Sequence, residues 1–125
     1  MPGKVSVMVV DDEESVRKIL CENLEECGFE VAFAKDGQEA LQMIDDGALP
    51  QVVITDIIMP RREGLEVITE LRKKYPAIHL IAISGGGRTK SADFLMLAKK
   101  LGADAVLAKP FDIETLEKTV RGLVA

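Results

Sequence analysis

Polar side chains that could act together follow four short apolar runs of this sequence. Asp11 and Asp12 come after the first run, Asp56 and Ser84 close two later runs, and Lys109 follows the last. Carboxylates held close together repel one another, since two unit charges about 4 Å apart cost on the order of 4 kcal/mol at an effective dielectric of 20. If these carboxylates meet, they need a positive counter-charge. A hard divalent cation with oxygen ligands, ordinarily Mg²⁺, would supply it.

The remaining two groups complement such a cluster. Lys109 carries an ammonium group on a flexible stem, which suits a carboxylate or a phosphate. The hydroxyl of Ser84 can donate a hydrogen bond to an oxyanion. A carboxylate that attacks, together with a cation, an ammonium group and a hydroxyl that neutralise charge, is the equipment of phosphoryl transfer. Asp56 is the candidate nucleophile of this set.

The elements that must position these residues alternate along the chain. Short runs rich in β-branched residues predict buried strands, and the stretches between them have helical periodicity. In the first helix the predicted inward stripe contains Val16, Ile19 with Leu20, Asn23 with Leu24, and Cys27. The predicted strands are residues 5–10, 30–34, 51–55, 79–84 and 105–108, and the predicted helices are residues 13–27, 38–46, 65–74 and 90–101 and a last helix, capped by Asp112, that ends near Leu123.

Such alternation predicts an α/β fold of the flavodoxin-like, doubly wound type. Right-handed crossovers place five parallel strands in one sheet between two layers of helices, a (βα)5 three-layer sandwich with strand order 2-1-3-4-5. Ligands of open parallel sheets bind outside the carboxyl ends of the strands, at the point where the winding reverses. Strands one and three are neighbours there. The acidic pair, Asp56, Ser84 and Lys109 should therefore converge on one edge.

Taken singly, each of these residues has an ordinary structural explanation. The acidic pair could be a solvated turn before a helix N-terminus. Asp56 could be a turn residue, Ser84 could belong to a glycine-rich loop, and Lys109 could be a surface lysine. His79 begins a strand at the other end and is predicted to be structural or exposed. Only the conjunction of four polar strand ends favours a functional site.

Composition limits the other classes of function. The chain has 125 residues, which is one domain, and its 16 basic and 21 acidic residues give a net charge of −5. This charge argues against direct nucleic-acid binding. No apolar run approaches the roughly 18 residues of a membrane span, and the N-terminus does not resemble a signal peptide, so a cytoplasmic protein without membrane contact is expected. Cys21 and Cys27 point in different directions on one helix and are expected to remain unpaired.

The combination of motifs resembles the receiver domain of bacterial response regulators, the phosphorylated switch of two-component phosphorelays. The resemblance runs from about Lys4 to Leu123 and rests on VVDDEE, ITDIIMPRREG around Asp56, the Ser84–Gly85 strand end and AKPF. It implies that the whole chain, residues 1–125, is one receiver domain without an output domain. The alternative is a domain cut from a longer regulator or hybrid kinase.

The resemblance also implies a role for each matching residue. Asp56 would be the phosphoacceptor. Asp11, Asp12, Asp56 and the backbone carbonyl of Ile58 would bind Mg²⁺. The hydroxyl of Ser84 would follow the phosphoryl group, and Lys109 would contact Asp56 and then the phosphate. The implied partners are a sensor histidine kinase or phosphotransfer protein and a downstream target protein, with the chain a monomer or a phosphorylation-dependent dimer.

The sequence departs from the family pattern at a few positions. Val106 stands where the family often has an aromatic residue that moves with the hydroxyl. The segment 85–90 is longer than usual and is expected to order on activation. Ile58 and Gly86 replace polar side chains that tune hydrolysis, so slow autodephosphorylation is expected. Apart from these self-reactions, no enzymatic activity is expected.

Two rival classes lack features that they need. An aspartate-dependent phosphatase would place its nucleophile on the first strand in a D-x-D arrangement, whereas Asp11 and Asp12 are adjacent and no cap domain is present. A flavin module would need a Ser/Thr/Gly-rich phosphate loop after that strand, where this chain is acidic and would repel a phosphate. Turnover of a phosphomonoester would support the phosphatase, and a coloured purified protein would support the flavin module.

Overall fold

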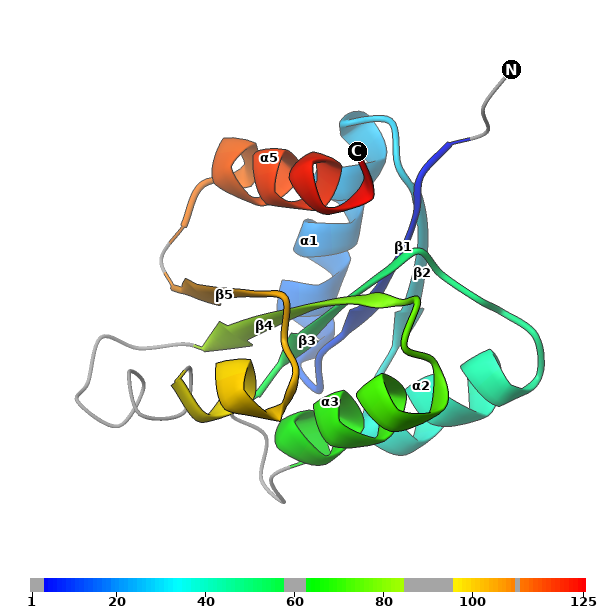
Figure 1. Cartoon of the computed structure of the whole chain (residues 1–125). Coiled ribbons are helices and arrows are strands. Elements are labelled where there is room, and N and C mark those ends of the chain that lie inside the picture. Colours follow the sequence, from blue (N-terminus) through cyan, green and yellow to red (C-terminus); the bar gives the residue numbers. More distant parts are fainter. Residues whose placement is uncertain (1–3, 58–62, 85–95, 110) are drawn as a thin grey trace.

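A computed structural model of the chain describes residues 4–57, 63–84, 96–109 and 111–125. The strands and helices alternate as predicted (Figure 1). The strands are β1 (Ser6–Val10), β2 (Glu30–Ala34), β3 (Val52–Asp56), β4 (His79–Ser84) and β5 (Ala105–Ala108). The helices are α1 (Glu14–Glu26), α2 (Gly37–Asp45), α3 (Glu63–Lys74) and α5 (Ile113–Val124), and residues 96–101 are also helical.

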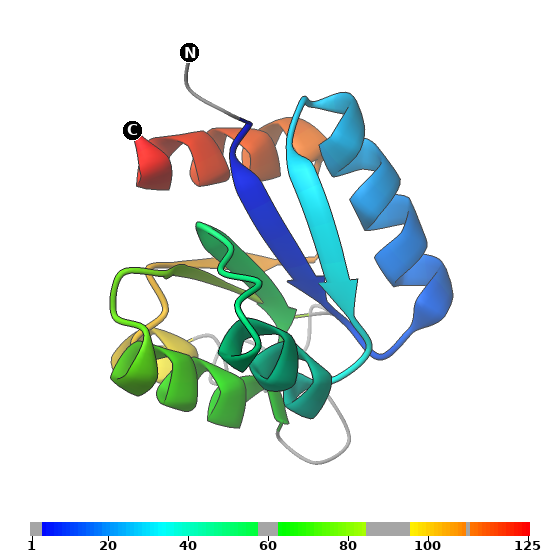
Figure 2. The same cartoon turned by 90° about the vertical axis from the view of Figure 1, so that its right-hand side faces the viewer.

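All strand pairs are parallel, and the five strands follow the predicted order β2-β1-β3-β4-β5. α1 and α5 cover one face of the sheet, and α2, α3 and residues 96–101 cover the other (Figures 1 and 2). The period of two along each strand divides its side chains between the layers. Val7 and Val9 of β1 pack with α1 and α5, while Met8 and Val10 pack on the opposite side. The predicted three-layer sandwich is therefore confirmed.

The predicted helix boundaries can be compared with those in the structure. The side chain of Asp112 accepts a hydrogen bond from the backbone N–H of Thr115 at 2.8 Å, as its predicted capping role requires. Asp36 caps α2 in the same way through the N–H of Glu39. α3 begins two residues before the predicted start. Of the helix predicted at 90–101, residues 90–95 lie outside the described part of the chain.

The buried stripe of α1 is narrower than the sequence predicted. Leu24 is fully buried and Leu20 packs against the core, but the side chain of Ile19 is 61% exposed. β2 is the edge strand of the sheet, so the layer beneath α1 is too narrow to cover a wide apolar stripe. The prediction that Ile19 points inward was therefore wrong. The two cysteines are free thiols, as predicted.

Candidate functional site

The carboxyl ends of the strands meet along one edge of the sheet, and hydrogen bonds continue the strand pairing beyond them. The N–H of Asp11 donates to the carbonyl of Ala34 at 3.2 Å. The N–H of Lys109 donates to the carbonyl of Ser84 at 2.8 Å. Asp56 is the last residue of β3 and pairs in register with Ile83. Asp11, Asp56, Ser84 and Lys109 are thus fixed by backbone contacts at the strand ends.

The most direct sign of convergence is an ion pair between residues 53 positions apart. The Nζ atom of Lys109 lies 3.2 Å from Oδ2 of Asp56. The side chain of Asp56 is 12% exposed and that of Lys109 is 31% exposed, so the pair is reachable from solvent at the sheet edge. A partly buried carboxylate needs such a partner, because desolvation disfavours its charged form. The predicted contact between these two residues is present.

Asp11 lies beside this pair and is buried. Its Oδ1 accepts a hydrogen bond from the N–H of Glu13 at 2.9 Å. Burial raises the pKa of the Asp11 carboxyl above its ordinary value, and the negative charges of Asp56 and Asp12 raise it further, while the Glu13 hydrogen bond and the charge of Lys109 lower it. The three carboxylates therefore interact electrostatically, although Asp12 itself is exposed.

Ser84 closes β4 and is fully buried. Its backbone bond to Lys109 places the two predicted phosphate-contacting residues next to each other. Thr55, which the sequence analysis did not single out, is also fully buried, and its hydroxyl donates to the backbone carbonyl of Asp56 at 3.1 Å. Its position directly before the candidate nucleophile, in a strand predicted to be buried, could have indicated that Thr55 contacts the site. Val106 is partly buried against the core on the α2 and α3 side.

Arg17 is a second residue that sequence reasoning missed. It lies in the first turn of α1, and its Nη1 donates to the backbone carbonyl of Asp11 at 2.8 Å. The positive end of the helix dipole disfavours a cation in this position. A cation in this unfavourable position, just after the acidic pair, indicates that a nearby oxygen accepts a hydrogen bond from it.

The donor atoms suit a hard cation, but they do not form a complete cage. Asp11, Asp12 and Asp56 offer carboxylate oxygens. The pKa of Asp11 is raised mainly by burial and also by the charges of Asp56 and Asp12, and a nearby positive charge would oppose both causes. Within the described residues, no group of three or more His, Cys, Asp or Glu side chains is arranged to hold a metal ion. Mg²⁺ commonly keeps several waters and uses only one or two carboxylates, so the residues fit this ion. Ile58, the predicted carbonyl ligand, and Gly86 lie outside the described residues.

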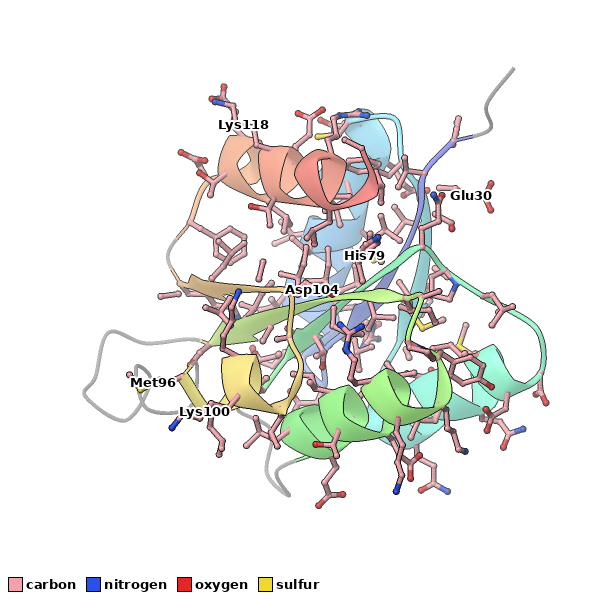
Figure 3. All side chains as sticks on the ribbon, in the orientation of Figure 1. Glu30, His79, Met96, Lys100, Asp104 and Lys118 are labelled. Atoms are coloured by element: carbon pink, nitrogen blue, oxygen red, sulfur yellow. The ribbon has the colours of Figure 1, made fainter. Side chains whose placement is uncertain are left out.

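The lone histidine lies away from this edge, as predicted. His79 begins β4, and its Nδ1 is 3.9 Å from Oδ2 of Asp104 (Figure 3). The same carboxylate oxygen accepts hydrogen bonds from Arg72 at 2.7 Å and from the N–H of Leu80 at 2.8 Å. This group joins α3 to the start of β4 and the segment before β5. Its position at the amino end of the strand indicates a structural role.

Comparisons with known proteins agree with the fold. The family model for the response regulator receiver domain matches residues 7–121. The chain is 40% identical to the probable transcriptional regulator ycf27 of Guillardia theta, over 97% of this chain and 46% of that protein. It is 37% identical to response regulator RR06 of Streptococcus pneumoniae, over 96% of this chain and 53% of that protein. The crystal structure of the receiver domain of NtrX from Brucella abortus superposes with a TM-score of 0.85 at 31% identity, covering 94% of this chain and 97% of that domain.

The chain belongs to the response-regulator receiver domain family of two-component systems. The resemblance inferred from its motifs is therefore confirmed. The chain spans about half the length of the curated relatives that it matches. None of the helices in the described part of the chain is long and apolar enough to cross a lipid bilayer.

Proposed function

We propose that this receiver domain accepts a phosphoryl group on the carboxylate of Asp56 from a histidine kinase or a phosphotransfer protein. The observation that carries the proposal is the ion pair of Asp56 with Lys109, with the buried carboxylate of Asp11 beside it. A carboxylate at the sheet edge that is exposed enough to be reached and already faces an ammonium group is placed to act as a nucleophile. Membership of the receiver family supports the same assignment.

In the proposed transfer, a carboxylate oxygen of Asp56 attacks the phosphorus of a phosphohistidine. The O–P bond forms as the P–N bond breaks, and the imidazole leaves with the bonding electrons and is protonated by solvent. Lys109 passes from the Asp56 carboxylate to a phosphoryl oxygen, where its charge stabilises the acyl phosphate. Ser84, adjacent to Lys109 through its backbone bond, donates its hydroxyl to another phosphoryl oxygen.

The acidic residues would hold the cation that this transfer needs. Asp11, Asp12 and Asp56 would supply oxygen ligands for Mg²⁺, and the expected fourth ligand is the carbonyl of Ile58. When bound, Mg²⁺ neutralises charge that develops on the transferred group. Before it arrives, Lys109 offsets part of the repulsion among the carboxylates, as its lowering effect on the pKa of Asp11 indicates.

The chain acts in this account as a switch rather than an enzyme that turns over a substrate. Its own phosphorylation and a slow hydrolysis, expected from Ile58 and Gly86, are its only reactions. Movement of Ser84 and Lys109 toward the phosphoryl group would change which target protein binds. A coupling of about 1–3 kcal/mol is enough to change such an affinity 5–150-fold. The net charge of −5 favours a protein over nucleic acid as the direct partner.

The test is to incubate the chain with Mg²⁺ and acetyl phosphate and to record its intact mass. The parent is expected to gain one phosphoryl mass, and the Asp56→Asn variant is expected to gain none, because its amide cannot act as the nucleophile. Asp46→Asn is a matched control, since Asp46 lies at the C-terminus of α2 and its side chain accepts a hydrogen bond from Gln42 there. Equal phosphorylation of the parent and Asp56→Asn would overturn the proposal.

A further inference from the structure

Arg17 connects the edge strand β2 to the acidic pair. Its guanidinium carbon lies 5.3 Å from the centre of the Phe33 ring, and its Nη1 donates to the carbonyl oxygen of Asp11 at 2.8 Å. Figure 2 shows α1 running beside β2, which explains how a side chain of the first helical turn reaches both groups. A guanidinium group over an aromatic face is attracted to it and is also restricted in its orientation.

The carbonyl that Arg17 contacts belongs to the peptide group joining Asp11 to Asp12. This group is planar, so fixing its oxygen restricts the backbone on both sides. Asp11 has two further tethers, from its N–H to the carbonyl of Ala34 and from its Oδ1 to the N–H of Glu13. Arg17 is thus the tether that acts on the link between the two carboxylates. The bond to the N–H of Glu13 closes a turn around Asp12, whereas Arg17 holds the carbonyl oxygen of the joining peptide itself.

The exposure of Phe33 has an explanation in the same contact. Its side chain is 55% exposed although it is a large apolar group at the end of a strand. It therefore contributes little to the core. Its ring instead provides the surface on which the guanidinium of Arg17 lies. A lysine in place of Arg17 would keep the charge, but it would lose the planar group that can stack and donate at the same time.

We propose that Arg17, held on Phe33, is a positioning residue that fixes the Asp11–Asp12 peptide so that both carboxylates are oriented for a divalent cation before it binds. The inference rests on the proposed function, because it assumes that this pair binds Mg²⁺. Arg17 touches no reacting atom. Its effect should therefore fall on the affinity for the cation and not on the transfer step in the fully loaded protein.

The experiment is a calorimetric titration of the full chain with Mg²⁺, without a phosphodonor. Arg17→Lys is expected to raise the Mg²⁺ dissociation constant about tenfold, the order found when groups that orient metal ligands are removed. Phe33→Leu should act in the same direction with a smaller effect, and the double variant should be no weaker than Arg17→Lys alone. At saturating Mg²⁺, the phosphorylation rate of each variant by acetyl phosphate should return to that of the parent.

Lys18→Met is the matched control, because Lys18 is an exposed cation next to Arg17 on α1. It should not raise the dissociation constant, since loss of a nearby positive charge alone favours cation binding. Unchanged affinity in Arg17→Lys, or a rate deficit that persists at saturating Mg²⁺, would overturn the inference. If Arg17→Lys does not fold, unchanged affinity in Phe33→Leu overturns it instead. A parent chain that binds no Mg²⁺ would overturn the inference together with the proposed metal site.

Discussion

At the scale of residues, Lys109 is expected to act both before and after phosphorylation. It offsets the carboxylates around Asp56 in the resting site, and it is proposed to stabilise the phosphoryl group after transfer. In the first role its removal would increase carboxylate repulsion, and in the second it would slow phosphorylation. Both effects come from one ammonium group 3.2 Å from the nucleophile.

The Lys109→Met variant is expected to be phosphorylated more slowly than the parent by acetyl phosphate at saturating Mg²⁺. The reduction should be on the order of 10²-fold, as for loss of one charge-stabilising donor in an active site. Lys118→Met, a change of the same kind on the exposed face of α5 (Figure 3), is the control and should leave the rate unchanged. A parental rate in Lys109→Met would exclude the proposed role.

Asp11 makes the stability of the metal-free chain depend on pH. Its pKa is raised in the folded state above the ordinary value of 3.8, chiefly by burial. Between 3.8 and the raised pKa the folded state binds more protons than the unfolded state, so stability falls as pH rises through this window. The penalty is complete above the raised pKa and absent below 3.8.

Asp11→Asn should therefore increase the free energy of unfolding at pH 7 in the presence of a chelator. Asn keeps an oxygen that can accept from the N–H of Glu13 and removes the buried charge. The gain should shrink as pH is lowered and vanish below 3.8, where Asp11 is protonated in both states. Urea unfolding at several pH values measures this. A gain that is independent of pH would show that the charge of Asp11 is not its cause.

At the scale of elements, the end of the sheet opposite the site is held by Arg72 of α3. Its Nε and Nη2 donate to the carbonyl of Gly102 at 3.0 and 2.7 Å, and Nη2 also contacts Asp104 at 2.7 Å. Nη1 donates to the carbonyl of Pro76. Gly102 has φ +125°, and a Cβ atom there would meet the Arg72 side chain at 2.8 Å, so glycine is required by both conformation and space.

Arg72→Met should lower the free energy of unfolding by about 2 kcal/mol, because several bonds to a charged donor are lost while the apolar stem is kept. Lys73→Met, an exposed change in the same turn, is the control and should have little effect. Because Arg72 contacts the segments that precede β4 and β5 and not the site, the phosphorylation rate should remain parental in folded protein. A large loss of rate with unchanged stability would contradict this assignment.

The elements also show how far the sequence could be interpreted. The spans of β2, β4 and β5 agree with the predicted ranges, because turn residues on either side of each short apolar run mark where the strand begins and ends. The N-cap of α5 at Asp112 could be predicted because an aspartate side chain accepts hydrogen bonds from the first free N–H groups of a helix. Ile19 could not be assigned correctly, since its exposure depends on the width of the sheet beneath α1 rather than on helical periodicity.

At the scale of the whole molecule, the convergence of the acidic pair, Asp56, Ser84 and Lys109 could be predicted because parallel strands bring their carboxyl ends to one edge. For Arg17 the sequence indicates only that a local acceptor exists, because which carbonyl it contacts depends on backbone geometry that residue types do not encode. The chain corresponds to about half of its curated relatives, and its matched region contains every residue of the proposed site.

The most direct test of the central claim is to identify which side chain carries the phosphoryl group. The chain is incubated with Mg²⁺ and acetyl phosphate and then reduced with borohydride, which converts an aspartyl phosphate to homoserine with release of phosphate. Peptide mass spectrometry then locates the homoserine. The homoserine is expected at position 56 and nowhere else. Homoserine at position 11 or 12, or none at position 56 in protein that has gained the phosphoryl mass, would contradict the account.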